Sequence, residues 1–138
     1  MDLALPCAIG VALALGVTLL GRLVGLDRDR AFYPTILIVI AILYDLFAVM
    51  GGSMNALLVE SLVGFIFAVS AVVGFKSSLW IVAAGLAGHG VFDLFHGHLI
   101  SNPGVPHFWP AFCGSFDVAA GACLAWLLKR SVIRSRPA

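Results

Sequence analysis

The sequence predicts an all-α, polytopic integral membrane protein, folded as a bundle of five transmembrane helices. Hydrophobic residues make up 62% of the 138-residue chain and charged residues only 11%, whereas charged residues are about a quarter of an ordinary soluble domain. The mean hydropathy is +1.09. Apolar runs long enough to cross a hydrocarbon layer of about 30 Å occupy nearly the whole chain, so we expect a single membrane domain over residues 1–138.

Short polar connections separate the five apolar runs and define each helix in turn. The first run follows Met1-Asp2, a flank that lacks the basic residues of a cleavable signal sequence. The second begins at Pro34 and ends at the GGSM connection, the third and fourth meet at KSS, and the fifth follows the ISNPGVPHFW loop. The predicted helices cover residues 3–21, 34–50, 55–75, 79–99 and 110–128, and a basic cytoplasmic tail covers 129–138.

The basic residues of the chain predict its orientation. All eight fall on the side shared by the first and third connections and the C-terminus: Arg22, Arg28, Arg30, Lys76, Lys129, Arg130, Arg134 and Arg136. Lys and Arg accumulate in the cytoplasmic loops of membrane proteins. We therefore expect a multi-pass protein of the cell membrane with its N-terminus outside and its C-terminus in the cytoplasm.

Four carboxylates lie inside the predicted helices and share one depth. At a rise of about 1.5 Å per residue, each lies roughly 8–10 Å below the outer membrane boundary: Asp45, Glu60, Asp93 and Asp117. Small residues such as Gly90 and Gly114 flank them, so these helices can approach closely enough for the carboxylates to share partners. Candidate hydrogen-bond partners are Tyr44, Ser61 and Ser115.

Histidines lie beside these carboxylates in the fourth predicted helix, within the segment GHGVFDLFHGH. His89, Asp93 and His96 follow i, i+4, i+7 spacing, which places them on one helical stripe about 60° wide. His98 points away from this stripe, and His107 lies in the following loop. An ionisable group inside a membrane is costly enough to indicate function. The predicted site comprises Asp45, Glu60, His89, Asp93, His96 and Asp117.

The four carboxylates need neutralisation, because no Lys or Arg lies at their level and ionised carboxylates repel each other in a low-dielectric medium. Shared protons, a protonated histidine or a bound cation would each serve. Imidazole and carboxylate ligands suit a divalent metal such as zinc. The candidate metal ligands are His89, Asp93 and His96, and bound zinc would generate hydroxide near neutral pH.

Three classes of function fit such a site. A membrane-embedded enzyme would use it for acid–base or metal-assisted isomerisation, cyclisation or hydrolysis of a lipophilic substrate from the lipid bilayer. A proton- or cation-coupled transporter or channel subunit would need polar groups throughout the span, and the inner half offers few. An accessory subunit would bind partners in a membrane complex. We expect the enzyme.

The small size of the chain is compatible with a homo-oligomer or with a partner in a membrane complex. A nucleic-acid partner is not expected, because the basic residues lie in short flanks rather than on one folded basic face.

Overall fold

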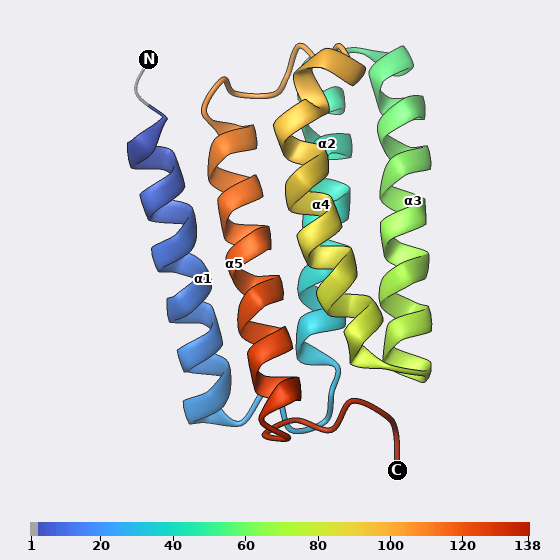
Figure 1. Ribbon diagram of the computed structural model, residues 1–138. Coiled ribbons are helices and arrows are strands. Elements are labelled where there is room, and N and C mark those ends of the chain that lie inside the picture. The colour runs from blue at the N-terminus through green and yellow to red at the C-terminus, as the bar shows by residue number, and fades with distance from the viewer. Residues whose placement is uncertain (1–2) are drawn as a thin grey trace.

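The computed structural model describes residues 3–138, which form five α-helices and no strands (Figure 1). The helices are α1 (Ala4–Val24), α2 (Phe32–Met50), α3 (Met54–Lys76), α4 (Leu79–Leu99) and α5 (Trp109–Lys129). Each is long and apolar enough to span a membrane. The prediction of an all-α bundle of five transmembrane helices is confirmed, and the orientation of its termini stays a prediction.

The helices run alternately up and down, so every connection lies at one of two ends of the bundle (Figure 1). The end that holds the α1–α2 and α3–α4 connections and the C-terminus carries all eight Lys and Arg residues of the sequence, and is termed the basic end. α5 packs against α1 and α4, α4 packs against α3 and α2, and α2 packs against α3. α1 thus joins the bundle mainly through α5.

Local signals set the helix boundaries. α1 continues past the predicted end at Gly21, because Gly25 provides the cap: it adopts φ 85° and its N–H donates to Gly21 O at 2.9 Å. Glycine enters this left-handed conformation without a steric penalty. Arg22 lies in the last turn, where its long side chain can extend toward water. At the start of α3, Ser53 Oγ accepts a hydrogen bond from Ala56 N at 3.2 Å.

The apolar core occupies the half of the bundle nearer the basic end. Leu37 of α2, Leu86 of α4 and Leu124 of α5 are completely buried there. On the outward faces, large apolar side chains such as Leu19 and Phe65 are exposed. Broad exposed apolar surfaces of this kind are typical of a membrane-facing protein.

Side-chain contacts tie the connections together at the basic end. Asp27 is buried in the α1–α2 connection and pairs with Arg22 at 3.0 Å. Arg30 donates hydrogen bonds to the main-chain oxygens of Phe75 at 2.8 Å and Arg134 at 2.9 Å. The α1–α2 connection is therefore fastened both to the end of α3 and to the segment that follows α5.

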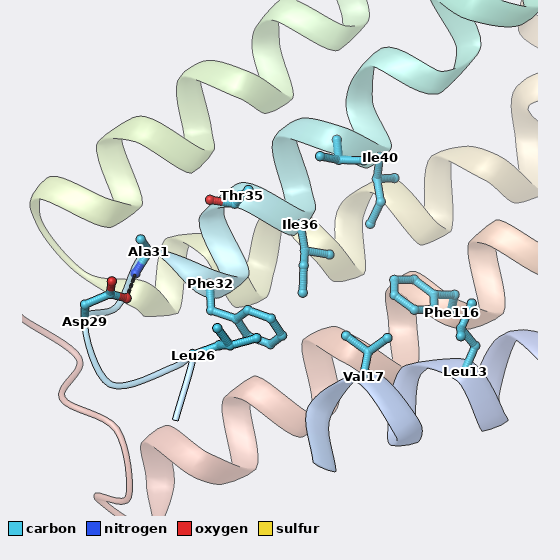
Figure 2. Close-up of a pocket in the computed structure, with 11 residues that line it drawn as sticks. Leu13, Val17, Leu26, Asp29, Ala31, Phe32, Thr35, Ile36, Ile40 and Phe116 are labelled. Atoms are coloured by element: carbon cyan, nitrogen blue, oxygen red, sulfur yellow. Dashed lines mark hydrogen bonds between the residues drawn. The ribbon is translucent and has the colours of Figure 1, made fainter. Parts of the chain in front are cut away.

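A surface groove of about 450 Å³ opens between α1, α2 and α5 near the basic end (Figure 2). Val17 of α1, Ile36 of α2 and Phe116 of α5 are among its apolar lining residues. Asp29 also lines it, but its Oδ1 accepts a 3.1 Å hydrogen bond from Ala31 N within the same loop. The surface of the groove is therefore mainly hydrocarbon. The buried histidines and their carboxylate partners lie toward the other end of the bundle.

Candidate functional site

α4 and α5 approach each other closely at a pair of glycines. A Cβ atom added to Gly90 would lie 2.7 Å from Gly114 O, and one added to Gly114 would lie 3.0 Å from Gly90 O. Each glycine lies opposite an aspartate of the other helix. The Cβ atom added to Gly90 would lie 3.1 Å from Asp117 Cβ, and the one added to Gly114 would lie 3.2 Å from Asp93 Cβ. Close backbone approach therefore brings one carboxylate from each helix into a shared site.

Four buried side chains meet beside this helix contact and form what is termed the His89 cluster: His89, Asp93, Cys113 and Asp117. His89 Nδ1 lies 2.7 Å from Asp117 Oδ2 and 3.8 Å from Asp93 Oδ2. Cys113 Sγ lies 3.8 Å from Asp117 Oδ2. One potential ligand atom from each residue lies within 4.8 Å of the others, and each residue is at most 3% exposed.

A second histidine–carboxylate contact, termed the His96 pair, lies nearer the end opposite the basic end. His96 Nε2 lies 2.7 Å from Glu60 Oε1, and both residues are buried. Asn102, in the α4–α5 loop, donates from Nδ2 to Glu60 Oε1 at 2.9 Å and to the main-chain oxygen of Tyr44 at 3.1 Å. The hydrogen bonds of Asn102 thus hold the α4–α5 loop close to the His96 pair.

Tyr44 of α2 lies between the two histidine sites. Its hydroxyl donates to Asp93 Oδ1 at 2.7 Å, and its ring stacks on His96 with ring centres 4.0 Å apart and planes inclined by 14°. Phe67 packs edge-on against His89 with ring centres 4.7 Å apart. These aromatic contacts restrict the orientations of both imidazole rings.

His96 also lines a cleft of about 390 Å³ formed by the end of α4, the α4–α5 loop and the start of α5. Asn102, Ser101 and His107 contribute polar groups to its wall, and Ile100 and Pro106 contribute apolar ones. His96 therefore borders this cleft although it is only 2% exposed, while the His89 cluster lies deeper between α4 and α5.

The structure brings five of the six predicted site residues into this network and places Asp45 apart from it. Asp45 lies on the α3-facing side of α2, where Ser61 Oγ donates to its Oδ1 at 2.9 Å. Its neighbour Tyr44 takes the inward position, because consecutive helical residues point about 100° apart. His98 and His107 are exposed. The functional roles assigned to the six residues stay predictions.

The three candidate metal ligands of α4 divide between the two sites. His89 and Asp93 belong to the same cluster, but His96 lies two helical turns away along the axis, about 10 Å, and its Nε2 contacts Glu60. The other potential metal ligands beside His89 and Asp93 are Cys113 and Asp117, which belong to α5.

Cys113 and Asn102 belong to the network but are neither predicted site residues nor predicted hydrogen-bond partners. Cys113 precedes Asp117 by four residues, a spacing that places both on one face of α5, so the sequence carries a signal for it. Asn102 has no such signal, because a loop position reveals nothing about the helices that it contacts. Its part in the site follows only from its hydrogen bonds to α2 and α3.

The fold and the site together define a multi-pass membrane protein with a buried His/Asp/Cys cluster. Comparisons with protein-family models, curated proteins and solved structures find no match to the chain.

Proposed function

We propose that this chain is a small membrane-embedded enzyme that performs acid–base chemistry on a lipophilic substrate, with the His96 pair beside the cleft as its acid–base group. The observation that carries the proposal is the 2.7 Å contact between His96 Nε2 and Glu60 Oε1 beside an open cleft. Histidine is the most frequent general acid–base residue in enzymes, and a carboxylate partner fixes its tautomer.

Glu60 determines which nitrogen of His96 would react. An ionised carboxylate only accepts hydrogen bonds, so Glu60 would hold the proton on Nε2 and leave Nδ1 to exchange a proton with the substrate. Asn102 donates to the same Glu60 oxygen at 2.9 Å, which restricts rotation of the carboxylate. The ring of Tyr44 stacks on the imidazole and restricts its tilt. The chain thus supplies an oriented acid–base group.

The surroundings of the cleft support a lipophilic substrate. Phe95 and Leu99 on the last turns of α4 are exposed and apolar, and the adjoining cleft is lined by polar and apolar groups in similar measure. A bilayer-dissolved molecule could keep its hydrocarbon part beside α4 while it places a polar group at His96.

The apolar core favours an enzyme over a transporter. Leu37, Leu86 and Leu124 are completely buried between the His89 cluster and the basic end. A proton or cation that crossed the bundle would have to pass this layer, and polar groups normally mark such paths. Substrate access from the cleft alone requires no passage through the core.

The proposal can be tested by comparing the lipids of membranes that contain the wild-type chain with those that contain His96→Gln. High-resolution mass spectrometry should reveal a lipid converted by the wild type, and the conversion should be lost in His96→Gln and in Glu60→Gln. His98→Gln is a matched control, because His98 lies two residues away on the same helix and is exposed. Identical lipids in all membranes, together with Asp93-dependent proton flux in reconstituted vesicles, would refute the enzyme and support transport.

A further inference from the structure

Two carboxylate oxygens in the His89 cluster are buried without a hydrogen-bond partner among residues 3–138: Asp93 Oδ2 and Asp117 Oδ1. Asp93 is 1% exposed and Asp117 is 0% exposed. All eight Lys and Arg residues of the sequence lie at the basic end, away from this cluster. A buried charged oxygen is strongly unfavourable unless a partner compensates it. A proton on His89 or on an aspartate would compensate part of the charge of this cluster, and a cation bound beside the two unpaired oxygens would compensate all of it.

The donor atoms around these oxygens suit a metal ion. Ligands of a tetrahedral zinc ion at about 2.0–2.3 Å lie roughly 3.3–3.8 Å from one another. The contact of His89 Nδ1 with Asp93 Oδ2 and that of Cys113 Sγ with Asp117 Oδ2 both measure 3.8 Å, close to this separation. The 2.7 Å contact of His89 Nδ1 with Asp117 Oδ2 is shorter, so these two side chains must move apart when an ion binds. The set supplies nitrogen, sulfur and oxygen from four buried residues.

We propose that His89, Asp93, Cys113 and Asp117 bind one divalent transition-metal ion of the zinc type. A thiolate and an imidazole select such ions over magnesium and calcium, which prefer oxygen ligands alone. Binding releases the Cys113 thiol proton and any proton on His89 Nδ1, because both atoms must offer a free electron pair to the ion. The hydrogen bond between His89 Nδ1 and Asp117 Oδ2 is then replaced by bonds to the metal.

Neighbouring residues present these ligands in the required way. Tyr44 donates to Asp93 Oδ1 at 2.7 Å and so leaves Oδ2 free for the ion. Phe67 packs edge-on against the His89 ring. Hydrogen bonds and packing around metal ligands commonly fix their orientation and raise metal affinity.

The metal site deepens the proposed function. Metal binding depends only on the four ligands, so only the role of the ion in a reaction rests on the proposed function. His96 is outside the ligand set because its Nε2 contacts Glu60. The ion and the acid–base pair would therefore occupy neighbouring but separate positions, connected through Tyr44. This separation allows the two proposals to be tested independently.

Metal binding is tested on the full chain purified in detergent without chelators, dialysed against zinc and analysed by elemental mass spectrometry. The wild type should hold about one zinc ion per chain. Cys113→Ala should weaken zinc affinity roughly 100-fold or more, whereas Cys123→Ala and His96→Gln should retain the ion. Cys123 is the matched control, because it lies on the same helix outside the cluster.

Cobalt substitution identifies the ligand without any activity assay. Co²⁺ bound to the wild type should show thiolate-to-cobalt charge-transfer absorption, which Cys113→Ala should lose and Cys123→Ala should keep. Thermal unfolding and size-exclusion profiles establish that each variant is folded. A folded wild type with no zinc or cobalt, or cobalt absorption unchanged in Cys113→Ala, would overturn the metal site.

The two proposals fail in different ways. Lipid conversion that depends on His96 in a metal-free wild type would overturn the metal site and leave the proposed enzyme intact. A bound ion in a protein that converts no lipid would support the metal site and contradict the proposed function.

Discussion

The hydroxyl of Tyr44 donates a 2.7 Å hydrogen bond to Asp93 Oδ1, which links α2 to α4 inside the bundle. The same tyrosine ring lies face to face with His96 at 4.0 Å. One side chain therefore supports the His89 cluster through its oxygen and the His96 pair through its ring. A change at Tyr44 can separate these two contributions.

Tyr44→Phe should destabilise the bundle by about 1 kcal/mol, because it removes one buried hydrogen bond and keeps the stacked ring. Tyr44→Leu should destabilise it further, since the contact with the His96 ring is then lost as well. Thermal or denaturant unfolding in detergent measures both effects. Equal stability of the wild type and Tyr44→Phe would show that the hydroxyl does not support Asp93.

Asn102→Ala should lower the free energy of unfolding by about 1–3 kcal/mol, because it removes hydrogen bonds to a buried carboxylate and to a main-chain oxygen. The α4–α5 loop should also become more sensitive to limited proteolysis. Asn55→Ala is the control, since Asn55 is exposed at the same end of the bundle. A similar response of both variants would argue against the loop being fastened by Asn102.

Gly90→Ala should destabilise the protein by about 1–3 kcal/mol, because the new methyl group would lie 2.7 Å from Gly114 O and would push α4 away from α5. Gly88→Ala is the matched control on the same helix. Its Cβ atom would meet only Phe67 Cε1 at 3.9 Å, which is an ordinary contact, so stability should be kept or slightly raised. Unfolding curves that rank the two variants in the opposite order would contradict the close helix approach.

Hydropathy and helical periodicity predict much of this structure. Each span must satisfy its own backbone and present apolar side chains to lipid, so the predicted fourth helix, 79–99, coincides with α4, Leu79–Leu99. The spacing of His89, Asp93 and His96 predicts one shared face, and all three are buried. These features depend on local sequence, so they can be predicted without a structure.

The partner that each side chain meets depends on how the helices are arranged, which no local pattern contains. α5 places Asp117 against His89, whereas α3 places Glu60 against His96. Asp45 has the depth expected of a site residue but points toward α3, since depth along a helix does not determine direction around it. Seven residues span about 10 Å of helix axis, so spacing alone already argues against one ion bound by both histidines.

Orientation decides which compartment supplies water to the cleft beside His96, and the basic residues predict it. All eight Lys and Arg residues of the sequence lie at the basic end, and such residues are favoured on the cytoplasmic side. Alkaline phosphatase, which is active only after export, should therefore be active when fused after Gly52 and inactive when fused after Arg136. A fusion after Ser78, in the α3–α4 connection, should be inactive as an internal control. Activity after Arg136 and Ser78 but not after Gly52 would show that the orientation is the reverse of the predicted one. The cleft would then receive its water and polar reactants from the cytoplasm.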